Sequence, residues 1–368
     1  MKERVAQERN AVKVVGLDRG ELVFVGVDVH KRTHHVAVLS SQRGLLSYWV
    51  QPAKPELLIE KLSPFRKHVA QVVYEAGPTG YGLVRALRSA RIKADVIAPG
   101  SIPQPPVAQG KSDRLDCRKL AEYACKGMLK AVCVPDEEEE ADRQVVRLRW
   151  RRVDKCRQIK QQIKGLLLQH GIAEPEGLEN WTKRAVVELR GLPLRPELRF
   201  SLDVMLDEME HAQGQVARVT EKLKELEASE RHSADVAVLR SAPGVGLITA
   251  MTFKTELVAP ERFENPREVS LMQGLSPQVY ESGETRREGR LMSSGNRYLR
   301  TILVEAAWRW VQHDPGAARK YRQLVANTGS AKKAIVGMAR KLGIILWRML
   351  TRGEKYRGFV AEKPARAG

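Results

Sequence analysis

Four acidic residues in the first third of the chain have the types and spacing that metal-dependent chemistry requires. Asp28 lies at the end of the apolar run LVFVGVDV, and Glu75 at the end of a second short run, QVVYEA. Asp113 and Asp116 lie three residues apart at the start of a predicted helix, so they share one face. Strand ends at one edge of a mixed sheet are where sites are built, so the helical pair could complete a four-carboxylate cluster there. Such a cluster needs a cation, and carboxylate oxygens suit Mg²⁺ or Mn²⁺.

This acidic set would suit chemistry on a phosphate, because two metal ions about 4 Å apart can clamp a scissile phosphodiester. Each acid also has a structural interpretation when it is taken singly. Asp28 could cap a turn, Glu75 could precede Gly77 and Pro78 by chance, and Asp113 could oppose the helix dipole. The set is therefore more informative than any one member.

A serine among arginines is the second candidate centre. Ser282 and Gly283 are followed closely by Arg286, Arg287 and Arg290. A serine hydroxyl in such a field could attack a phosphate while the guanidinium groups stabilise the developing charge. It could also be a loop serine in a strip that contacts phosphates, and spacing alone favours this loop interpretation.

The segment LRSAPGVGLITA, residues 239–250, has the pattern of a helix-hairpin-helix element. Gly244 and Gly246 would let backbone N–H groups approach a DNA phosphate, although an ordinary tight turn between two helices fits the same residues. Four histidines have no metal-ligand spacing and are expected to be surface or core residues: His30, His34, His35 and His170.

The charge balance indicates the class of partner. The 368 residues include 63 Lys and Arg against 44 Asp and Glu, a formal net charge of +19, so nucleic acid is expected before a membrane surface. Residues 284–368 hold 19 basic and 6 acidic residues. Apolar helical stretches at 298–310 and 331–350 indicate that this region folds and presents a basic face, to which Arg297 and Arg300 contribute.

Composition argues against other classes of protein. The longest apolar runs are far shorter than the roughly 18 residues that a membrane span needs. The N-terminus, MKERVAQERN, is charged and unlike a secretory signal. The four cysteines match no C-x-x-C zinc pattern: Cys117, Cys125, Cys133 and Cys156. We therefore expect a cytoplasmic, nucleoid-associated protein with no membrane partner.

Hydrophobic patterning predicts the elements that must position these residues. Five strands are expected at 22–29, 34–40, 44–50, 71–76 and 93–98, with helices from Pro55, over 79–91 and over 112–126, where Ser112 is a plausible cap. Three consecutive strands followed by alternating helix and strand indicate a mixed α/β sheet. Spacings of three and four then predict two long amphipathic helices, 137–172 and 202–228, as an antiparallel pair joined by a Pro- and Gly-richer connection, 173–200. The chain from 236 onward is expected to be mostly helical.

Taken together, these segments resemble the DEDD transposases of the insertion-sequence-110 family. The matching segments cover roughly residues 22–350, in order: VGVDVHKRTHHVAVL, VVYEAGPTGYGL, VAQGKSDRLDCRKLAEYA, APGVGLITA, RFENPREVSLMQGLSP, YESG and GNRYLRTILVEAAW. The resemblance implies an α/β plus α architecture. Its parts are an N-terminal extension (1–21), an RNase H-like, RuvC-like domain (22–135), coiled-coil linker helices (136–235), a helical transposase domain (236–355) and a tail (356–368).

The resemblance also implies roles for the candidate residues and partners. The four acids would bind metal, and Ser282 would be the catalytic serine of a recombinase that acts on donor and target DNA. A structured RNA from the element would choose both DNA partners. A dimer or tetramer would form composite sites in which acids of one subunit meet the serine of another. The chain departs from the family pattern at Ser293 and Ser294, where a basic pair is frequent, and these serines compete with Ser282 as nucleophile.

Two other functions remain open. A metal-dependent, RuvC-like endonuclease specific for DNA junctions or other structures would hydrolyse DNA without rejoining it, and it would need the acids but not Ser282. A non-catalytic DNA- or RNA-binding protein would use the hairpin and the basic C-terminal region, and it could dispense with the acids.

Overall fold

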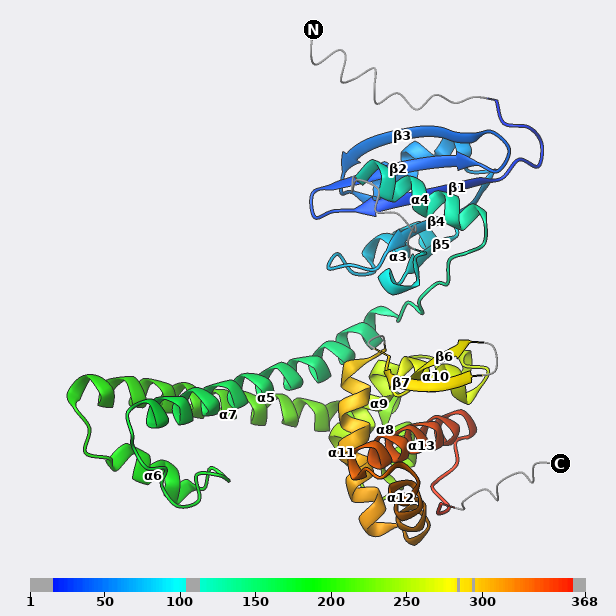
Figure 1. The fold of residues 1–368 in the computed structure, drawn as a ribbon. Coiled ribbons are helices and arrows are strands. Elements are labelled where there is room, and N and C mark those ends of the chain that lie inside the picture. The colour runs from blue at the N-terminus through cyan, green and yellow to red at the C-terminus, as the bar shows by residue number, and fades with distance from the viewer. Residues whose placement is uncertain (1–15, 104–112, 283–284, 293–294, 360–368) are drawn as a thin grey trace, which may run out of the picture. The chain divides into compact units, whose positions relative to one another are not determined.

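The computed structural model describes residues 16–103, 113–282, 285–292 and 295–359, and the chain divides into two units, Met1–Val134 and Pro135–Gly368. The first unit contains a five-stranded mixed sheet in the order β3-β2-β1-β4-β5 (Figure 1). Its strands are β1 (Val23–Val29), β2 (Thr33–Ser40), β3 (Gly44–Pro52), β4 (Val69–Glu75) and β5 (Ala94–Ile97). The first three form an antiparallel meander, whereas β1, β4 and β5 run parallel. All five predicted strands are present.

Helices cover both faces of this sheet. On one face, α2 (Pro55–Leu62) and α3 (Gly82–Ser89) pack on the valines at alternate positions of β1. On the other face lies α4 (Asp113–Cys125), which contacts β1, β2 and β4. This layering gives the mixed α/β architecture that the sequence predicts, and it leaves the polar start of α4 near the ends of the central strands. Ser112, the predicted cap of this helix, lies outside the described residues.

The segment before β1 packs on the same unit. Glu21 is buried, accepts a hydrogen bond from the Ser40 hydroxyl and faces Arg43, whose Nη2 lies 3.1 Å from the carboxylate. Leu17 packs against the valine face of the sheet. The described part of the expected N-terminal extension, from Gly16 onward, is thus joined to the sheet by side-chain contacts.

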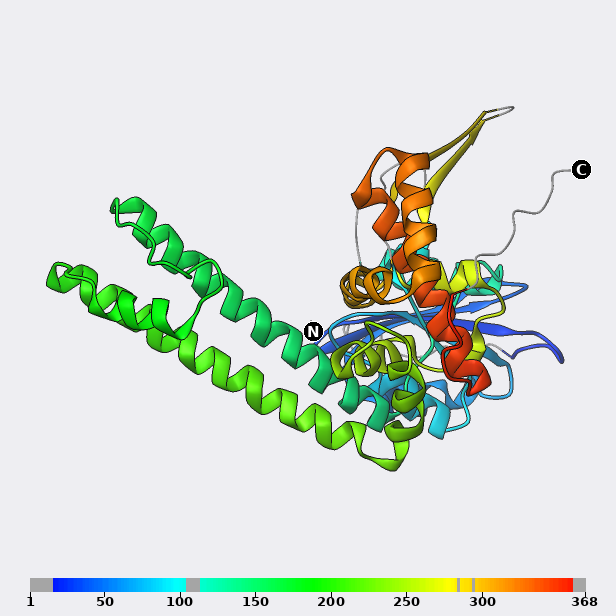
Figure 2. The same cartoon turned by 90° about the horizontal axis from the view of Figure 1, so that it is seen from below.

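Two long helices of the second unit, α5 (Glu137–Gln169) and α7 (Pro196–Glu227), lie side by side (Figures 1 and 2). They are antiparallel, since Lys155 pairs with Glu208 at 2.8 Å while Arg149 bonds Thr220 at 2.9 Å. Apolar residues of both helices lie in a shared core: Ile159, Ile163, Leu167, Leu202, Leu206 and Met209.

The connection between the long helices is more ordered than its composition predicts. It contains a helix, α6 (Lys183–Gly191), and α7 begins at Pro196 rather than near residue 202. Thr182 caps α6 through Ala185 N–H, and Ala185 and Leu189, four residues apart, are both buried. A short helix with one buried stripe gives too weak a periodic signal to be separated from a loop.

The rest of the second unit is a helical assembly around one apolar core. Its helices are α8 (Glu230–Arg240), α9 (Leu247–Leu257), α10 (Pro266–Met272), α11 (Arg297–His313), α12 (Pro315–Thr328) and α13 (Ala331–Arg352). Tyr356 and Phe359, in the segment expected to be a tail, also pack on this core. No helix among the described residues is long and apolar enough to cross a membrane.

A β-hairpin interrupts this helical assembly, where the sequence predicted a loop. Strands β6 (Pro277–Ser282) and β7 (Thr285–Leu291) pair antiparallel. Only Gly283 and Glu284 separate them, which is the length of a tight hairpin turn, so a local signal was present. The arginine-rich composition of the second strand hid that signal.

Candidate active site

Asp28 and Glu75 lie at the same edge of the sheet because β1 and β4 are parallel. Val27 of β1 pairs with Tyr74 of β4. Asp28 and Glu75 are the next residues of these two strands, so both acids lie where the strands end. Val73 packs with Leu120 of α4, and Glu75, two residues later, points to that same face.

Gly26 allows α4 to lie directly on β1, on the face to which Asp28 points. A Cβ atom built on Gly26 would lie 1.9 Å from the Cys117 carbonyl oxygen and 2.7 Å from Ala121 N. A larger residue would therefore push the helix off the strand. Asp28, two residues after Gly26, faces the same side of the sheet as the first turn of this helix.

The first turn of α4 brings Asp113 and Asp116 close to Asp28. Partial burial is the largest effect on the Asp28 carboxyl and raises its pKa. His30 opposes this shift, whereas the charges of Asp113 and Asp116 raise the pKa further. Three of the four predicted acids thus interact electrostatically, and Glu75 is exposed at the same edge.

Two histidines that the sequence assigned to surface or core lie within this cluster. His30 Nε2 is 3.1 Å from Asp28 Oδ2 and 3.5 Å from Asp113 Oδ2, while His35 Nε2 is 3.4 Å from the same Asp113 oxygen. The pairing of Asp28 with His35 across β1 and β2 could have indicated this, since directly opposed residues share a face. His34 instead lies on the valine face and is buried, which lowers its pKa.

Ser282 is the last residue of β6 and pairs with Thr285, and Glu281 pairs with Arg286. Arg290, further along β7, has an exposed side chain. Gly283 and the competing serines, Ser293 and Ser294, lie outside the described residues.

The two glycines of the predicted helix-hairpin-helix segment, residues 239–250, have different surroundings. Gly244 has a φ of +83°, and a Cβ there would lie 2.7 Å from the Ala306 carbonyl oxygen, so this residue lets the turn approach α11 closely. Gly246 precedes α9, and a Cβ there would meet nothing within 4 Å. Of this pair, only Gly244 is therefore required for close packing, and the predicted phosphate contact of Gly246 stays a prediction.

The two arginines at the start of α11 also have different surroundings. Arg297 is exposed, and its guanidinium lies 5.5 Å from the ring centre of Tyr298. Arg300 is half-buried and donates a hydrogen bond of 3.2 Å to the Met292 carbonyl. Arg300 therefore supports the segment before α11, whereas Arg297 faces solvent.

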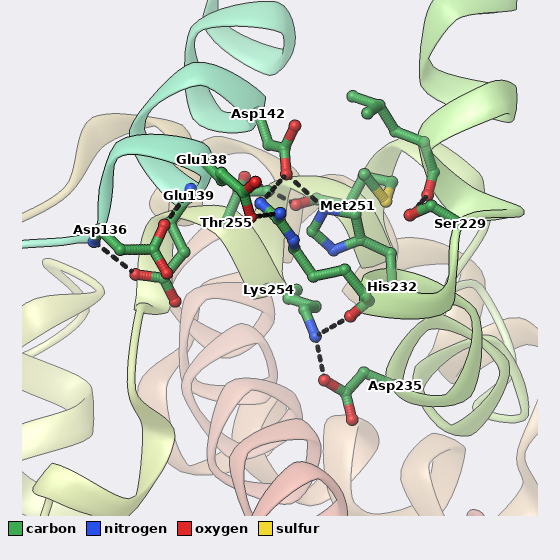
Figure 3. A network of polar contacts seen from close by, with 12 residues as sticks. Asp136, Glu138, Glu139, Asp142, Ser229, His232, Asp235, Met251, Lys254 and Thr255 are labelled. Atoms are coloured by element: carbon green, nitrogen blue, oxygen red, sulfur yellow. Dashed lines mark hydrogen bonds and ion pairs between the residues drawn. The ribbon is translucent and has the colours of Figure 1, made fainter.

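A polar network that no sequence motif indicated joins α5, α8 and α9 (Figure 3). Asp142 accepts bonds from His232 at 2.8 Å and Arg231 at 3.2 Å, and Lys254 pairs with Asp235. A cavity of about 140 Å³ lies beside it, lined by Asp136, Glu139, Arg231, His232, Lys254, Thr255 and Val258. The ion pairs of this network link three helices, and neither the network nor the cavity contains a predicted site residue.

Comparison with known proteins identifies the family. Residues 25–172 match a transposase family model for IS110-type DEDD transposases, and residues 236–323 match the model of the transposase IS116/IS110/IS902 family. The protein named "Putative transposase y4qE" from Sinorhizobium fredii is 34% identical over 90% of this chain and 83% of its own length. The transposase for insertion sequence element IS1111A of Coxiella burnetii is 26% identical over 78% of this chain and 80% of its own.

The transposase for insertion sequence element IS1533 of Leptospira borgpetersenii is 29% identical over 88% of this chain and 94% of its own length. The five-stranded mixed sheet is consistent with a DEDD RNase H-like domain, so the fold and the relatives agree. The chain belongs to the IS116/IS110/IS902 family of transposases, enzymes that cleave DNA and transfer its strands.

Proposed function

We propose that this transposase cuts and rejoins the DNA of an insertion sequence with the acidic cluster of its first unit and Ser282 of its second. The observation that carries the proposal is that Asp28 of β1 lies close to Asp113 and Asp116 in the first turn of α4, with His30 within 3.5 Å of both Asp28 and Asp113. Three carboxylates in mutual repulsion, one of them with a raised pKa, form a site that a cation stabilises.

The donor set suits a divalent metal. Asp28, Glu75, Asp113 and Asp116 would hold Mg²⁺ or Mn²⁺ through carboxylate oxygens, which are the ligands that these ions take. When bound, such an ion supplies charge stabilisation to a phosphate oxygen. Without an ion, the charged form of Asp28 is disfavoured, because burial and the neighbouring aspartates all raise its pKa.

Ser282 would act as the nucleophile on the phosphodiester. Its Oγ forms a bond to phosphorus as the bond from phosphorus to a sugar oxygen breaks; the hydroxyl proton leaves, and the sugar oxygen takes up a proton. The new phosphoserine ester conserves the energy of the broken ester, so a sugar hydroxyl of another strand can displace the serine and seal the DNA. Arg286, Arg287 and Arg290 follow closely and supply the positive charge that such a centre needs.

The choice of DNA and the assembly are further parts of the proposal. The basic surplus of residues 284–368 suits the binding of donor and target DNA and of a structured RNA from the element. The paired helices α5 and α7 are suited to a coiled-coil contact between subunits of a dimer or tetramer. In this division of labour, 22–135 is the catalytic domain, 136–235 the linker and 236–355 the transposase domain that carries the serine.

The test is to trap covalent adducts between the protein and a nicked donor DNA, with co-purifying RNA present, and to map the modified residue by mass spectrometry. We expect an adduct at Ser282 that is lost in Ser282→Ala and in Asp113→Asn. Glu122→Gln, a change of an acid further along α4, is the matched control and should retain the adduct.

Three outcomes would contradict parts of the proposal. An adduct at Ser293 or Ser294 would assign the attack to another serine. Cleavage with free 3′ hydroxyl ends and no adduct would favour the hydrolytic endonuclease. Nucleic-acid binding with no cleavage, unchanged in Asp113→Asn, would favour a non-catalytic binding protein.

A further inference from the structure

We propose that His30 and His35 are nitrogen ligands of the metal site, so that the site prefers Mn²⁺ to Mg²⁺. This inference rests on the proposed function in one respect, namely that the aspartates hold an ion. Four carboxylates would form an all-oxygen site. With the two imidazoles beside Asp113, the site has both oxygen and nitrogen ligands, and this changes which metal it prefers.

The positions of the donor atoms carry the proposal. Among the described residues, His30, His35 and Asp113 can each offer one ligand atom such that all three atoms lie within 4.8 Å of one another. Both histidines direct Nε2 at the same oxygen, Asp113 Oδ2, at 3.5 Å and 3.4 Å. The rings meet edge to face with centres 5.5 Å apart, so they approach that oxygen from different directions.

The second ring nitrogen of His35 is held in place by another side chain. His35 Nδ1 lies 2.9 Å from the Tyr48 hydroxyl, and the Arg114 guanidinium lies 5.2 Å from the centre of the Tyr48 ring. When Nδ1 donates its proton to this hydroxyl, Nε2 keeps the lone pair that a metal requires. Metal-binding histidines are regularly oriented by such a bond from the other nitrogen.

The backbone fixes both histidines relative to Asp28. His35 is paired with Asp28 across β1 and β2, and His30 directly follows β1 in the tight turn that Thr33 closes through its carbonyl. His34, between them in sequence, faces the opposite side of the sheet and lies outside the cluster. The strand register therefore places His35, and the turn after β1 places His30, close to Asp113.

The expected metal preference follows from ligand chemistry. Imidazole is a ligand for transition metals, whereas Mg²⁺ takes oxygen ligands and keeps several waters. Mn²⁺ accepts carboxylate oxygen and imidazole nitrogen together. Each histidine that binds should therefore strengthen Mn²⁺ binding more than Mg²⁺ binding.

Pulsed EPR of the full-length protein with Mn²⁺ tests the proposal directly. A coordinated imidazole nitrogen couples to the electron spin of the ion, and labelling all histidines with ¹⁵N should change that signal. We expect nitrogen coupling in the unmodified protein, a weaker signal in His30→Asn and in His35→Asn, and none in the double variant. His211→Asn, an exposed histidine on α7, is the matched control and should keep the full signal.

Equilibrium binding supplies the second measurement. Each single His→Asn change should weaken Mn²⁺ binding by about tenfold or more, the lower size of losses seen when support around a metal is removed. Mg²⁺ binding should change less, because the asparagine amide offers an oxygen, so the ratio of the two affinities should fall. Tyr48→Phe should retain the nitrogen coupling with a smaller loss of affinity, as expected for a positioning residue.

The outcomes separate this inference from the proposed function. Mn²⁺ that binds with no nitrogen coupling, and is lost in Asp28→Asn, would overturn the inference and leave the acidic site intact. Coupling that persists in the double histidine variant would also overturn it. Absence of any Mn²⁺ binding would overturn both the inference and the metal-dependent part of the proposed function. The measurement on the unmodified protein decides the matter even if a variant fails to fold.

Discussion

Arg147 and Glu256 are 109 residues apart in the chain and form a doubly hydrogen-bonded ion pair inside the second unit. Arg147 Nε lies 2.6 Å from Oε1 of Glu256, and Arg147 Nη2 lies 2.7 Å from Oε2. The Glu256 side chain is fully buried, and Oε2 also accepts a bond of 2.6 Å from Asn296, the N-cap of α11. One carboxylate therefore links α5, α9 and the start of α11, next to the segment that contains the competing serines.

Replacing Glu256 by Gln should strongly destabilise the second unit. The change leaves the Arg147 charge without its carboxylate, and removing one partner of a buried pair costs about 3 kcal/mol or more of unfolding free energy. Urea denaturation measures this loss. Glu208→Gln, which breaks the more exposed pair with Lys155, is the control and should cost less than about 1 kcal/mol. Equal losses in both variants would show that the buried carboxylate has no special role.

Replacing Gly26 by Ala should remove metal binding at the acidic cluster. The added methyl group would lie 1.9 Å from the Cys117 backbone oxygen, so α4 must shift and take Asp113 and Asp116 with it. Calorimetric titration with Mn²⁺ should show a loss of affinity, together with a lower melting temperature. Gly82→Ala, at the start of α3 where a Cβ meets nothing within 4 Å, should bind the ion normally. Unchanged binding in Gly26→Ala would show that the position of α4 is not critical.

Arg297→Ala and Arg300→Ala should have different effects on DNA binding. Arg297 is exposed, and losing one phosphate contact should flatten the log–log slope of affinity against salt by about 0.9 on duplex DNA. Arg300 bonds the Met292 carbonyl, so its loss should lower the unfolding free energy and leave that slope nearly unchanged. Binding measured over a series of salt concentrations distinguishes them. A flatter slope for Arg300 alone would mean that this arginine, rather than Arg297, contacts phosphate.

Tyr356→Phe should destabilise the second unit in a pH-dependent way. The Tyr356 hydroxyl donates to Asp314 at 2.8 Å and accepts from Trp310 Nε1 at 2.8 Å. Burial is the main cause that raises its pKa above the ordinary value of 10.0. The loss should be about 1–3 kcal/mol near neutral pH, because the variant leaves the buried Trp310 N–H without an acceptor.

Above pH 10 this difference between the two proteins should shrink. The unfolded chain ionises at the ordinary pKa while the folded protein keeps its proton, so the unmodified protein loses stability as pH rises toward the raised value. Melting temperatures of both proteins from pH 8 upward measure the effect, since other titrating groups are common to both. A difference that stays constant above pH 10 would contradict the raised pKa.

Regular periodic segments could be read from the sequence, and short or isolated ones could not. Strands β1 and β4 could be predicted from their apolar runs. Helices α5 and α7 could be predicted from their apolar stripes, because buried positions repeat along one face of each helix. Helix α6 has only two buried residues, Ala185 and Leu189, and the sequence of β7 is rich in arginine, so both patterns were weak. The four acids were identified as a set, although their roles in metal binding and that of Ser282 in attack remain predictions.

The sequence alone determined the order of the elements, the basic character of the chain and its family, since these depend on local patterns and composition. Tertiary structure decided which side chains share a site. Two neighbouring histidines differ because alternate residues of a strand face opposite sides, so His35 lies close to Asp113 while His34 is buried. Two glycines of one turn differ because only Gly244 lies against α11. These distinctions arise from packing between distant segments, which no local pattern contains.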